Sequence, residues 1–188
     1  MLSKETSVLI SGAGPTGLTL ACDLARRGVN FRIIDKAPEY FRGSRGKGLQ
    51  PRSLEVMHFL GIVDRIIAHG RFRMLTRNYE GAGFVDRDMY EAFETTPGIP
   101  YGSPLMIAQW RVEEALRSLL GDRVELGAEL IGIEQNDEGV LATIRKGDET
   151  EQIRCQYLVG SDGGHSFVRK SQGIGFEGET WPNARMYV

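Results

Sequence analysis

The feature that most constrains the fold is a glycine-rich segment near the N-terminus, G-A-G-P-T-G at residues 12–17. The apolar residues 7–11 come directly before it and are typical of a buried parallel strand. An apolar stripe at helical spacing follows it and stops at Gly28, where a helix commonly ends. A strand, a glycine-rich turn and a helix in this order predict a Rossmann-type βαβ unit that binds the ADP half of a dinucleotide.

Each position of this turn has a physical role in holding a pyrophosphate. Gly12 permits the tight turn, Gly14 lets the pyrophosphate approach the backbone, and Gly17 allows close packing of the helix on the strand. Pro15 and Thr16 begin the helix, whose free N–H groups and positive dipole end hold phosphates. A glycine-rich turn without a ligand is the alternative interpretation.

A second strand, residues 31–35, ends in Asp35, 18 residues after Gly17. An acidic residue at this place accepts hydrogen bonds from the ribose hydroxyls of adenosine. Eight basic and only two acidic residues lie between Arg26 and Arg52. An anionic ligand near this stretch explains the imbalance, and a solvated basic face explains it about as well.

The composition argues against several other classes of function. A formal net charge of −2 over 188 residues gives no reason to expect nucleic acid or an anionic membrane as the main partner. The first six residues and the short apolar run after them resemble neither a signal peptide nor a membrane span. The two cysteines and three histidines lack metal-ligand spacing, and we interpret them as buried thiols and as packing or surface residues. We therefore expect a cytoplasmic protein without a metal site.

The middle of the chain combines helices with long loops. A Gly/Arg-rich loop, residues 38–50, contains Arg45, which can reach a pyrophosphate oxygen with two hydrogen bonds; an ordinary solvent loop is the alternative. Helices are predicted over residues 51–60, 63–68 and 112–119, a strand over 105–108, and a hairpin with long loops over 70–104. Gln109, between strand and helix, either donates its amide to the cofactor or only begins the helix.

From Arg123 the pattern changes to short strands separated by polar turns. Strands are predicted over residues 124–126, 130–135, 140–145 and 152–155, which together indicate an antiparallel meander. A further apolar strand, residues 157–159, then leads into Gly160-Ser161-Asp162-Gly163-Gly164. That order places Asp162 at the carboxyl edge of the sheet, beside the dinucleotide crevice.

Taken together, these segments resemble the class A FAD-dependent aromatic hydroxylases, flavoprotein monooxygenases with an FAD-binding fold of glutathione-reductase type. The glycine turn with Asp35 is similar to the ADP-binding fingerprint of that family, and residues 157–169 are similar to its Asp-Gly motif. Residues 45–55 and the Q-x-x-x-E-x-x-L pattern from Gln109 resemble two further parts of it. The resemblance implies an α/β fold with a parallel sheet plus an antiparallel meander, in which residues 70–104 make an excursion into the substrate-binding region.

The resemblance also implies FAD as the cofactor, NAD(P)H as its reductant, and a small aromatic substrate of phenolic or polyketide type. It implies that the FAD site is lined by Gly12, Gly14, Gly17, Asp35, Lys36, Arg45, Gln109 and Asp162. The second flavin fingerprint of the family has no match here. We therefore expect residues 1–188 to be the N-terminal FAD-binding portion of such an enzyme, incomplete relative to the family and inactive alone. No catalytic residue is assigned.

Three alternatives stay open at this point. One is a non-catalytic binding or chaperone-like protein on the same scaffold, which the intact glycine fingerprint disfavours. Another is a different FAD-dependent oxidoreductase. The third is an NAD-dependent dehydrogenase, whose Rossmann domain would continue with parallel βα units where residues 123–155 favour a meander.

Overall fold

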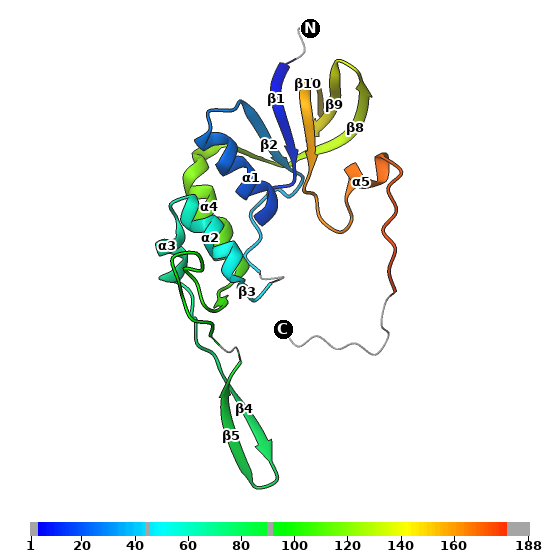
Figure 1. Ribbon diagram of the computed structural model, residues 1–188. Helices are drawn as coiled ribbons and strands as arrows, with labels where there is room; N and C mark the ends of the chain where they lie inside the picture. The colour runs from blue at the N-terminus through cyan, green and yellow to red at the C-terminus, as the bar shows by residue number, and fades with distance from the viewer. Residues whose placement is uncertain (1–3, 44–45, 90–91, 180–188) are drawn as a thin grey trace.

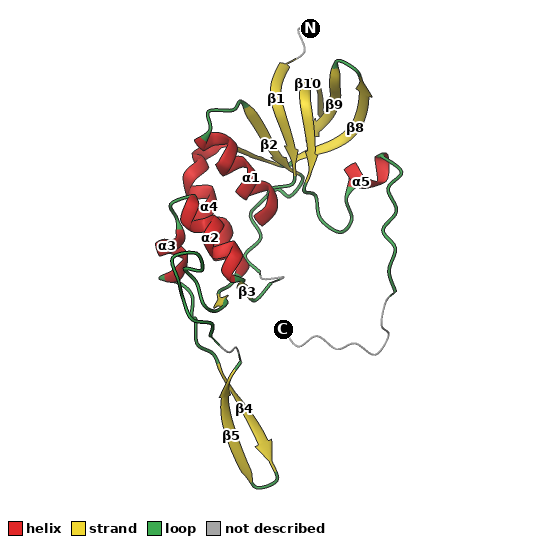
Figure 2. Cartoon of the chain, in the orientation of Figure 1, coloured by secondary structure: helices red, strands yellow, loops and turns green. Residues whose placement is uncertain are grey.

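A mixed six-stranded sheet organises the chain, with four helices gathered against one of its faces (Figure 1). The computed structural model describes residues 4–43, 46–89 and 92–179. Strands follow one another across the sheet in the order β7-β2-β1-β10-β9-β8. A separate two-stranded hairpin projects far from this body, as the secondary-structure colouring makes plain (Figure 2).

The parallel half of the sheet contains the predicted βαβ unit. Strand β1 (Lys4–Ser11) leads into helix α1 (Pro15–Arg26), and β2 (Phe31–Asp35) then pairs in parallel with β1. Strand β7 (Val124–Leu126) pairs in parallel with β2. The prediction of a strand, a glycine turn and a helix followed by a strand ending in Asp35 is therefore confirmed.

The antiparallel half consists of three consecutive strands. These are β8 (Ala128–Asn136), β9 (Gly139–Lys146) and β10 (Glu149–Gly160). Strand β10 pairs antiparallel with β9 and, along its other edge, parallel with β1 from Lys4 to Ser11. This one strand joins the meander to the Rossmann unit.

Two details of the meander prediction are wrong. The strands expected over residues 152–155 and 157–159 form one continuous strand, and residues 124–126 belong to the parallel half. The first part of β10 pairs with β9 and its later part pairs with β1, so the apolar pattern changes along the strand. The local sequence does not indicate the direction of a neighbouring strand.

The remaining elements are short and flank the parallel half. Helices α2 (Pro51–Phe59), α3 (Val63–Ile67) and α4 (Gln109–Leu120) lie beside α1, and a 3-10 turn η1 (Gly121–Arg123) follows α4. The small ribbon β3 (Gly48–Leu49) and β6 (Leu105–Met106) lies beyond them. The hairpin is β4 (Leu75–Glu80) and β5 (Gly83–Asp88), and α5 (Phe167–Ser171) ends the ordered elements.

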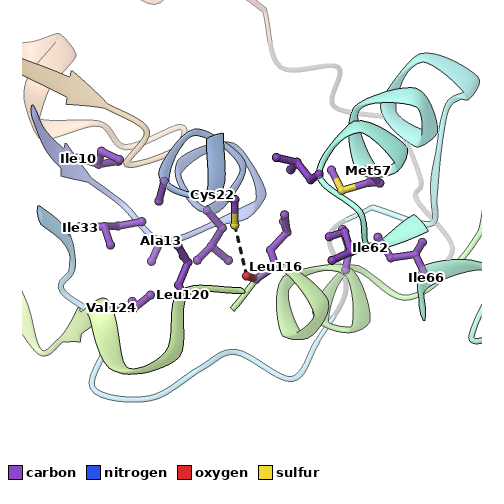
Figure 3. Packing of buried hydrophobic residues seen from close by; sticks show 14 of the residues in the cluster. Ile10, Ala13, Cys22, Ile33, Met57, Ile62, Ile66, Leu116, Leu120 and Val124 are labelled. Atoms are coloured by element: carbon purple, nitrogen blue, oxygen red, sulfur yellow. Dashed lines mark hydrogen bonds between the residues drawn. The ribbon is translucent and has the colours of Figure 1, made fainter. Parts of the chain in front are cut away.

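The larger core lies between the parallel strands and the four helices, as Figure 3 shows for part of the cluster. Val8 and Ile10 of β1 face this core, whereas Leu9 between them faces the opposite side, as alternation along a strand requires. The thiol of Cys22 donates to the Leu116 carbonyl oxygen at 3.3 Å and thus links α1 to α4 (Figure 3). Burial raises the pKa of Cys22 to about 11, which agrees with the prediction of a buried thiol.

A second, smaller core lies on the other face, where β8 and β9 curl over the sheet. Leu9 and Ile34 pack there with Ile144 and Ile153, and Val168 of α5 covers one side. Because both faces of β1 are buried, its apolar run is continuous rather than alternating. Within the described residues, no helix is long and apolar enough to cross a membrane.

Candidate cofactor site

The glycine turn between β1 and α1 is compressed against neighbouring backbone. Gly12 has a φ of +106°, and a Cβ atom there would lie 2.3 Å from the Ser161 carbonyl oxygen. A Cβ atom on Gly17 would lie 2.0 Å from the Gly12 carbonyl oxygen. Neither position has room for a side chain, so these two glycines are required by the fold itself.

Gly14 differs from its two neighbours. No described atom outside its immediate surroundings lies within 4 Å of the position that its Cβ would take. It is the N-cap residue of α1, with extended backbone and Pro15 following at the first helical position. The absent side chain therefore leaves open space at a helix N-terminus, where backbone N–H groups and the helix dipole favour an anion.

Asp35 ties the end of β2 to this turn. Its Oδ2 accepts a hydrogen bond from the Ala13 N–H at 2.7 Å, and its Oδ1 accepts one from the Ala37 N–H at 2.9 Å. A carboxylate has about four acceptor positions, so both oxygens can still accept further hydrogen bonds from a ligand. The structure thus gives Asp35 a structural role in addition to the predicted ribose contact.

The Asp-Gly loop after β10 lies against the same turn. The Ser161 hydroxyl is within 3.1 Å of both the Ser11 and the Gly12 carbonyl oxygens. Its backbone N–H also donates to the Ser11 carbonyl oxygen at 2.8 Å. Two loops separated by about 150 residues of sequence are therefore held together by the hydroxyl and the backbone N–H of Ser161.

Asp162 organises this second loop. Its Oδ1 accepts from the Ser166 hydroxyl at 2.5 Å, and its Oδ2 accepts from the N–H groups of Phe167 and Val168 at 2.7 and 3.2 Å. Burial alone would raise the pKa of Asp162, but these hydrogen bonds outweigh it and hold the pKa below its ordinary value. Asp162 is consequently ionised and accepts from the first N–H groups of α5, whose N-cap residue is Ser166.

The start of α4 contributes a chain of polar side chains. The Gln109 amide donates from Nε2 to Glu113 Oε1 at 2.8 Å, and Glu113 is only 6% exposed. Glu113 Oε2 lies 3.7 Å from Arg117 Nη1, and the Arg117 guanidinium stacks 3.9 Å above the Tyr40 ring. This chain connects α4 to the loop that follows β2.

These loops surround one cleft of about 690 Å³, which we call the cofactor cleft. All of the predicted site residues that the structure describes line it, except Gly17, which packs beneath the turn. They are Gly12, Gly14, Pro15, Thr16, Asp35, Lys36, Gln109 and Asp162. Arg45 lies outside the described residues.

Sequence reasoning missed several residues that line the cofactor cleft. Glu113 and Tyr40 belong to the polar chain described above, and Ser161 lies between the two loops. His165, interpreted as a packing or surface residue, also lines it. The spacing of Gln109, Glu113 and Arg117 at successive intervals of four was an available signal, since such residues share one helix face.

Most of the basic residues in the stretch from Arg26 to Arg52 do not face this cleft. Arg26 and Arg27 pair with Asp23. Arg32 pairs with Glu125 and Glu151 at 2.6 Å each, and Arg52 pairs with Glu55. Among the basic residues of that stretch that the structure describes, only Lys36 lines the cofactor cleft. The charge imbalance is therefore explained in large part by ion pairs within the fold.

Comparison with known proteins gives consistent results over almost the whole chain. The family described as FAD binding domain matches residues 5–186. A flavin-dependent monooxygenase of Mycobacteroides abscessus is 44% identical over 97% of this chain and 40% of that protein. The 6-methylpretetramide 4-monooxygenase of Streptomyces rimosus is 38% identical over 94% of this chain and 32% of that protein.

Solved structures show the same likeness. The flavin-dependent monooxygenase PieE, in complex with FAD and substrate, superposes with a TM-score of 0.78 at 26% identity, over 93% of this chain and 33% of that one. OxyS anhydrotetracycline hydroxylase from Streptomyces rimosus superposes with a TM-score of 0.76 at 31% identity, over 94% and 35%. The chain spans 40% or less of the length of each of these proteins.

Proposed function

Since the chain belongs to the FAD binding domain family of flavin-dependent monooxygenases, we propose that it binds FAD through the ADP half of the cofactor. We propose further that it is the FAD-binding part of a monooxygenase acting on an aromatic or polyketide-like substrate. The fold subclass consistent with this function is the glutathione-reductase type, in which a meander accompanies the Rossmann unit.

One observation carries the proposal. Gly14 is open to the cofactor cleft, while Gly12 and Gly17 are blocked by backbone atoms on the other side of the same turn. A structural turn needs only the two blocked glycines. The third makes room for a group that approaches the backbone at a helix N-terminus, as a pyrophosphate does.

The roles of the remaining residues follow from their places around the cleft. Asp35, at the carboxyl end of β2, would accept hydrogen bonds from the adenosine ribose. Lys36 would offset phosphate charge. Gln109, at the start of α4, and Asp162, after β10, line the same cleft and would hold the cofactor from its other walls. Bound FAD would supply the redox and oxygen chemistry, while these residues bind it, orient it and limit its contact with water.

We propose that residues 70–104 belong to the substrate-binding region. The β4–β5 hairpin buries none of its residues, and an isolated two-stranded hairpin is marginally stable in water. The rings of its exposed Tyr79 and Phe84 contact each other in a tilted arrangement, with centroids 6.3 Å apart. A hairpin of this kind gains stability by packing against further polypeptide, and the relatives named above are at least twice as long as this chain.

NAD(P)H as the reductant and an aromatic substrate are proposals that rest on this family membership. The relatives are named for substrates such as 6-methylpretetramide, pentachlorophenol and rifampicin. We propose that the 188-residue chain by itself hydroxylates none of them. Its cleft is open to solvent, and oxygen transfer requires a flavin ring shielded from water.

Calorimetric titration of the chain with FAD, ADP and FMN tests the proposal. FAD and ADP are expected to compete for one site, whereas FMN, which lacks the adenosine half, binds far more weakly. Gly14→Val should abolish FAD binding without unfolding the chain. Gly175→Val is the matched control, because Gly175 also has open space around it and lies outside the cleft. Absence of FAD binding to the folded wild-type chain would favour a non-catalytic protein on this scaffold.

A further inference from the structure

A charged pair of helix α4 lies beside the cofactor cleft and is largely removed from water. Glu113 is buried, and the Arg117 side chain is only 16% exposed. Burying two charges costs free energy that only a close, hydrogen-bonded geometry offsets. Glu113 Oε2 lies 3.7 Å from Arg117 Nη1, which is too far for a hydrogen bond. The stability of the fold alone therefore does not account for this pair.

The Arg117 guanidinium makes its closest contact with an aromatic ring. Its Nη1 atom is buried and has no hydrogen-bond partner among the described residues. The guanidinium carbon instead lies 3.9 Å from the centre of the Tyr40 ring. Because a guanidinium stacks on one face of a ring, Arg117 restricts where the Tyr40 ring can lie relative to α4.

Arg117 thereby joins two residues that line the cofactor cleft. Glu113 and Tyr40 both belong to the cleft lining, whereas Arg117 does not. Glu113 comes from α4, and Tyr40 comes from the loop after β2. In no other cation–π pair between described residues does the ring line this cleft. Arg117 is therefore placed to set the position of one cleft wall relative to another.

The loop that carries Tyr40 follows the residue expected to bind the adenosine ribose. Asp35 Oδ1 accepts from the Ala37 N–H at 2.9 Å, and the Ala37 carbonyl oxygen accepts from the Gly127 N–H at 2.9 Å. The loop is thus fixed at its start, and Tyr40 is held further along by Arg117. An aromatic side chain in the cleft lining offers a flat apolar surface for the adenosine end of a cofactor.

We propose that Arg117 is a positioning residue for FAD. It holds the Tyr40 ring at the cofactor cleft, where the ring contacts the ADP half, and it is itself held by the carboxylate of Glu113. This inference rests on the proposed function, because it assigns residues to the site of the same cofactor. Arg117 does not touch the cofactor, so its substitution should change cofactor affinity through Tyr40.

The test is a double-mutant cycle on the affinities for FAD and ADP, measured by calorimetric titration of the 188-residue chain. Arg117→Met and Tyr40→Leu are each expected to weaken both ligands about three- to tenfold. Because Arg117 acts through Tyr40, the double variant should bind no more weakly than the weaker single variant. Tyr40→Phe keeps the ring and should bind both ligands as the wild type does.

Arg111→Met is the matched control. The Arg111 guanidinium also lies 3.9 Å from a ring centre, that of Trp110. The two residues are neighbours on α4, and neither lines the cofactor cleft. This variant should leave both affinities unchanged. Circular dichroism of each variant shows whether it is folded at the titration temperature, so that a loss of affinity is not confused with unfolding.

Amide NMR spectra of the ligand-free proteins give a readout that is independent of binding. Arg117→Met should shift residues 39–41, and Arg111→Met should not. Absence of those shifts, additive losses in the double variant, or equal losses for Arg117→Met and Arg111→Met would overturn the inference while the proposed function stands. A folded wild type that binds neither FAD nor ADP would contradict both.

Discussion

The glycine turn and the β4–β5 hairpin are built in opposite ways. At the turn, Ser161 joins the loops after β1 and β10, and the carboxylates of Asp35 and Asp162 accept hydrogen bonds from backbone N–H groups. In the hairpin, the contacts are mainly between side chains on its exposed surface. Arg77 pairs with Asp86 through two bonds of 2.8 Å, and its guanidinium lies 3.9 Å above the Phe84 ring.

This difference shows which of the two regions is stabilised by contacts within the chain itself. The turn needs no further polypeptide to keep its shape, because its geometry is fixed by close backbone approach. The hairpin exposes 75% of Tyr79 and 54% of Phe84, so its conformation is stabilised by weak surface pairs. We therefore expect substitutions at the turn to cost much stability and substitutions in the hairpin to cost almost none.

The largest effect is expected at Gly17. Gly17→Ala places a Cβ atom 2.0 Å from the Gly12 carbonyl oxygen, so strand and helix must separate. We expect the free energy of unfolding to fall by about 3 kcal/mol or more, measured by urea denaturation. Gly14→Ala is the matched control and should cost less than about 1 kcal/mol. Equal losses for both variants would contradict the assignment of Gly14 to a ligand.

A smaller but pH-dependent effect is expected at Asp162. Asp162→Asn weakens the hydrogen bonds to the N–H groups of Phe167 and Val168, at a cost of about 1–2 kcal/mol at pH 7. The pKa of Asp162 is lowered in the folded chain, so its contribution is complete above its unfolded value near 4. It is lost as the pH falls from about 4 through the lower folded value.

Urea denaturation of the wild type and Asp162→Asn at pH 7, 5 and 3 measures this window. The difference between the two proteins should be constant between pH 7 and 5 and shrink at pH 3. A difference that grows on acidification would show that the carboxylate is destabilising in the fold.

An effect on cofactor affinity rather than on folding is expected at Glu113. Glu113→Ala removes the acceptor of the Gln109 amide and the counter-charge of Arg117, which stacks on Tyr40. We expect FAD affinity to fall about five- to tenfold, equivalent to roughly 1–1.4 kcal/mol, measured by fluorescence titration. Glu113→Gln keeps an acceptor and should restore most of the affinity. Equal losses for Ala and Gln would mean that the charge alone matters.

The smallest effect is expected in the hairpin. The double substitution of Tyr79 and Phe84 by serine removes the ring contact and the cation–π pair with Arg77. The free energy of unfolding of the chain should change by less than about 0.5 kcal/mol, because no core residue is touched. A larger loss, measured by urea denaturation, would show that the hairpin packs on the body in solution.

The parts of the fold that could be predicted are those encoded by local chemistry. Gly12, Gly17 and Asp35 follow from the needs of a tight strand–helix turn, and the order of the helices follows from apolar spacing. The continuity of β10 could not be predicted, because two neighbours with opposite directions share one strand. Nor could the ion pairs of Arg32, whose partners are 93 and 119 residues away.

The site shows the same division. The three-glycine turn and the Asp-Gly motif indicated the cofactor cleft, since both carry a required backbone conformation. The role of Glu113 depends on its burial and on its contact with Gln109, and a charged residue on a helix does not by itself indicate burial. Residues that act through long-range contacts were therefore found only in the structure.

The most direct test of the central claim is an amide NMR titration of the 188-residue chain with FAD. The account predicts the largest shifts at residues 12–17, 35–37 and 161–163, and none at residues 75–88 of the hairpin. Absence of shifts in the glycine turn at saturating FAD, or shifts confined to the hairpin, would contradict it.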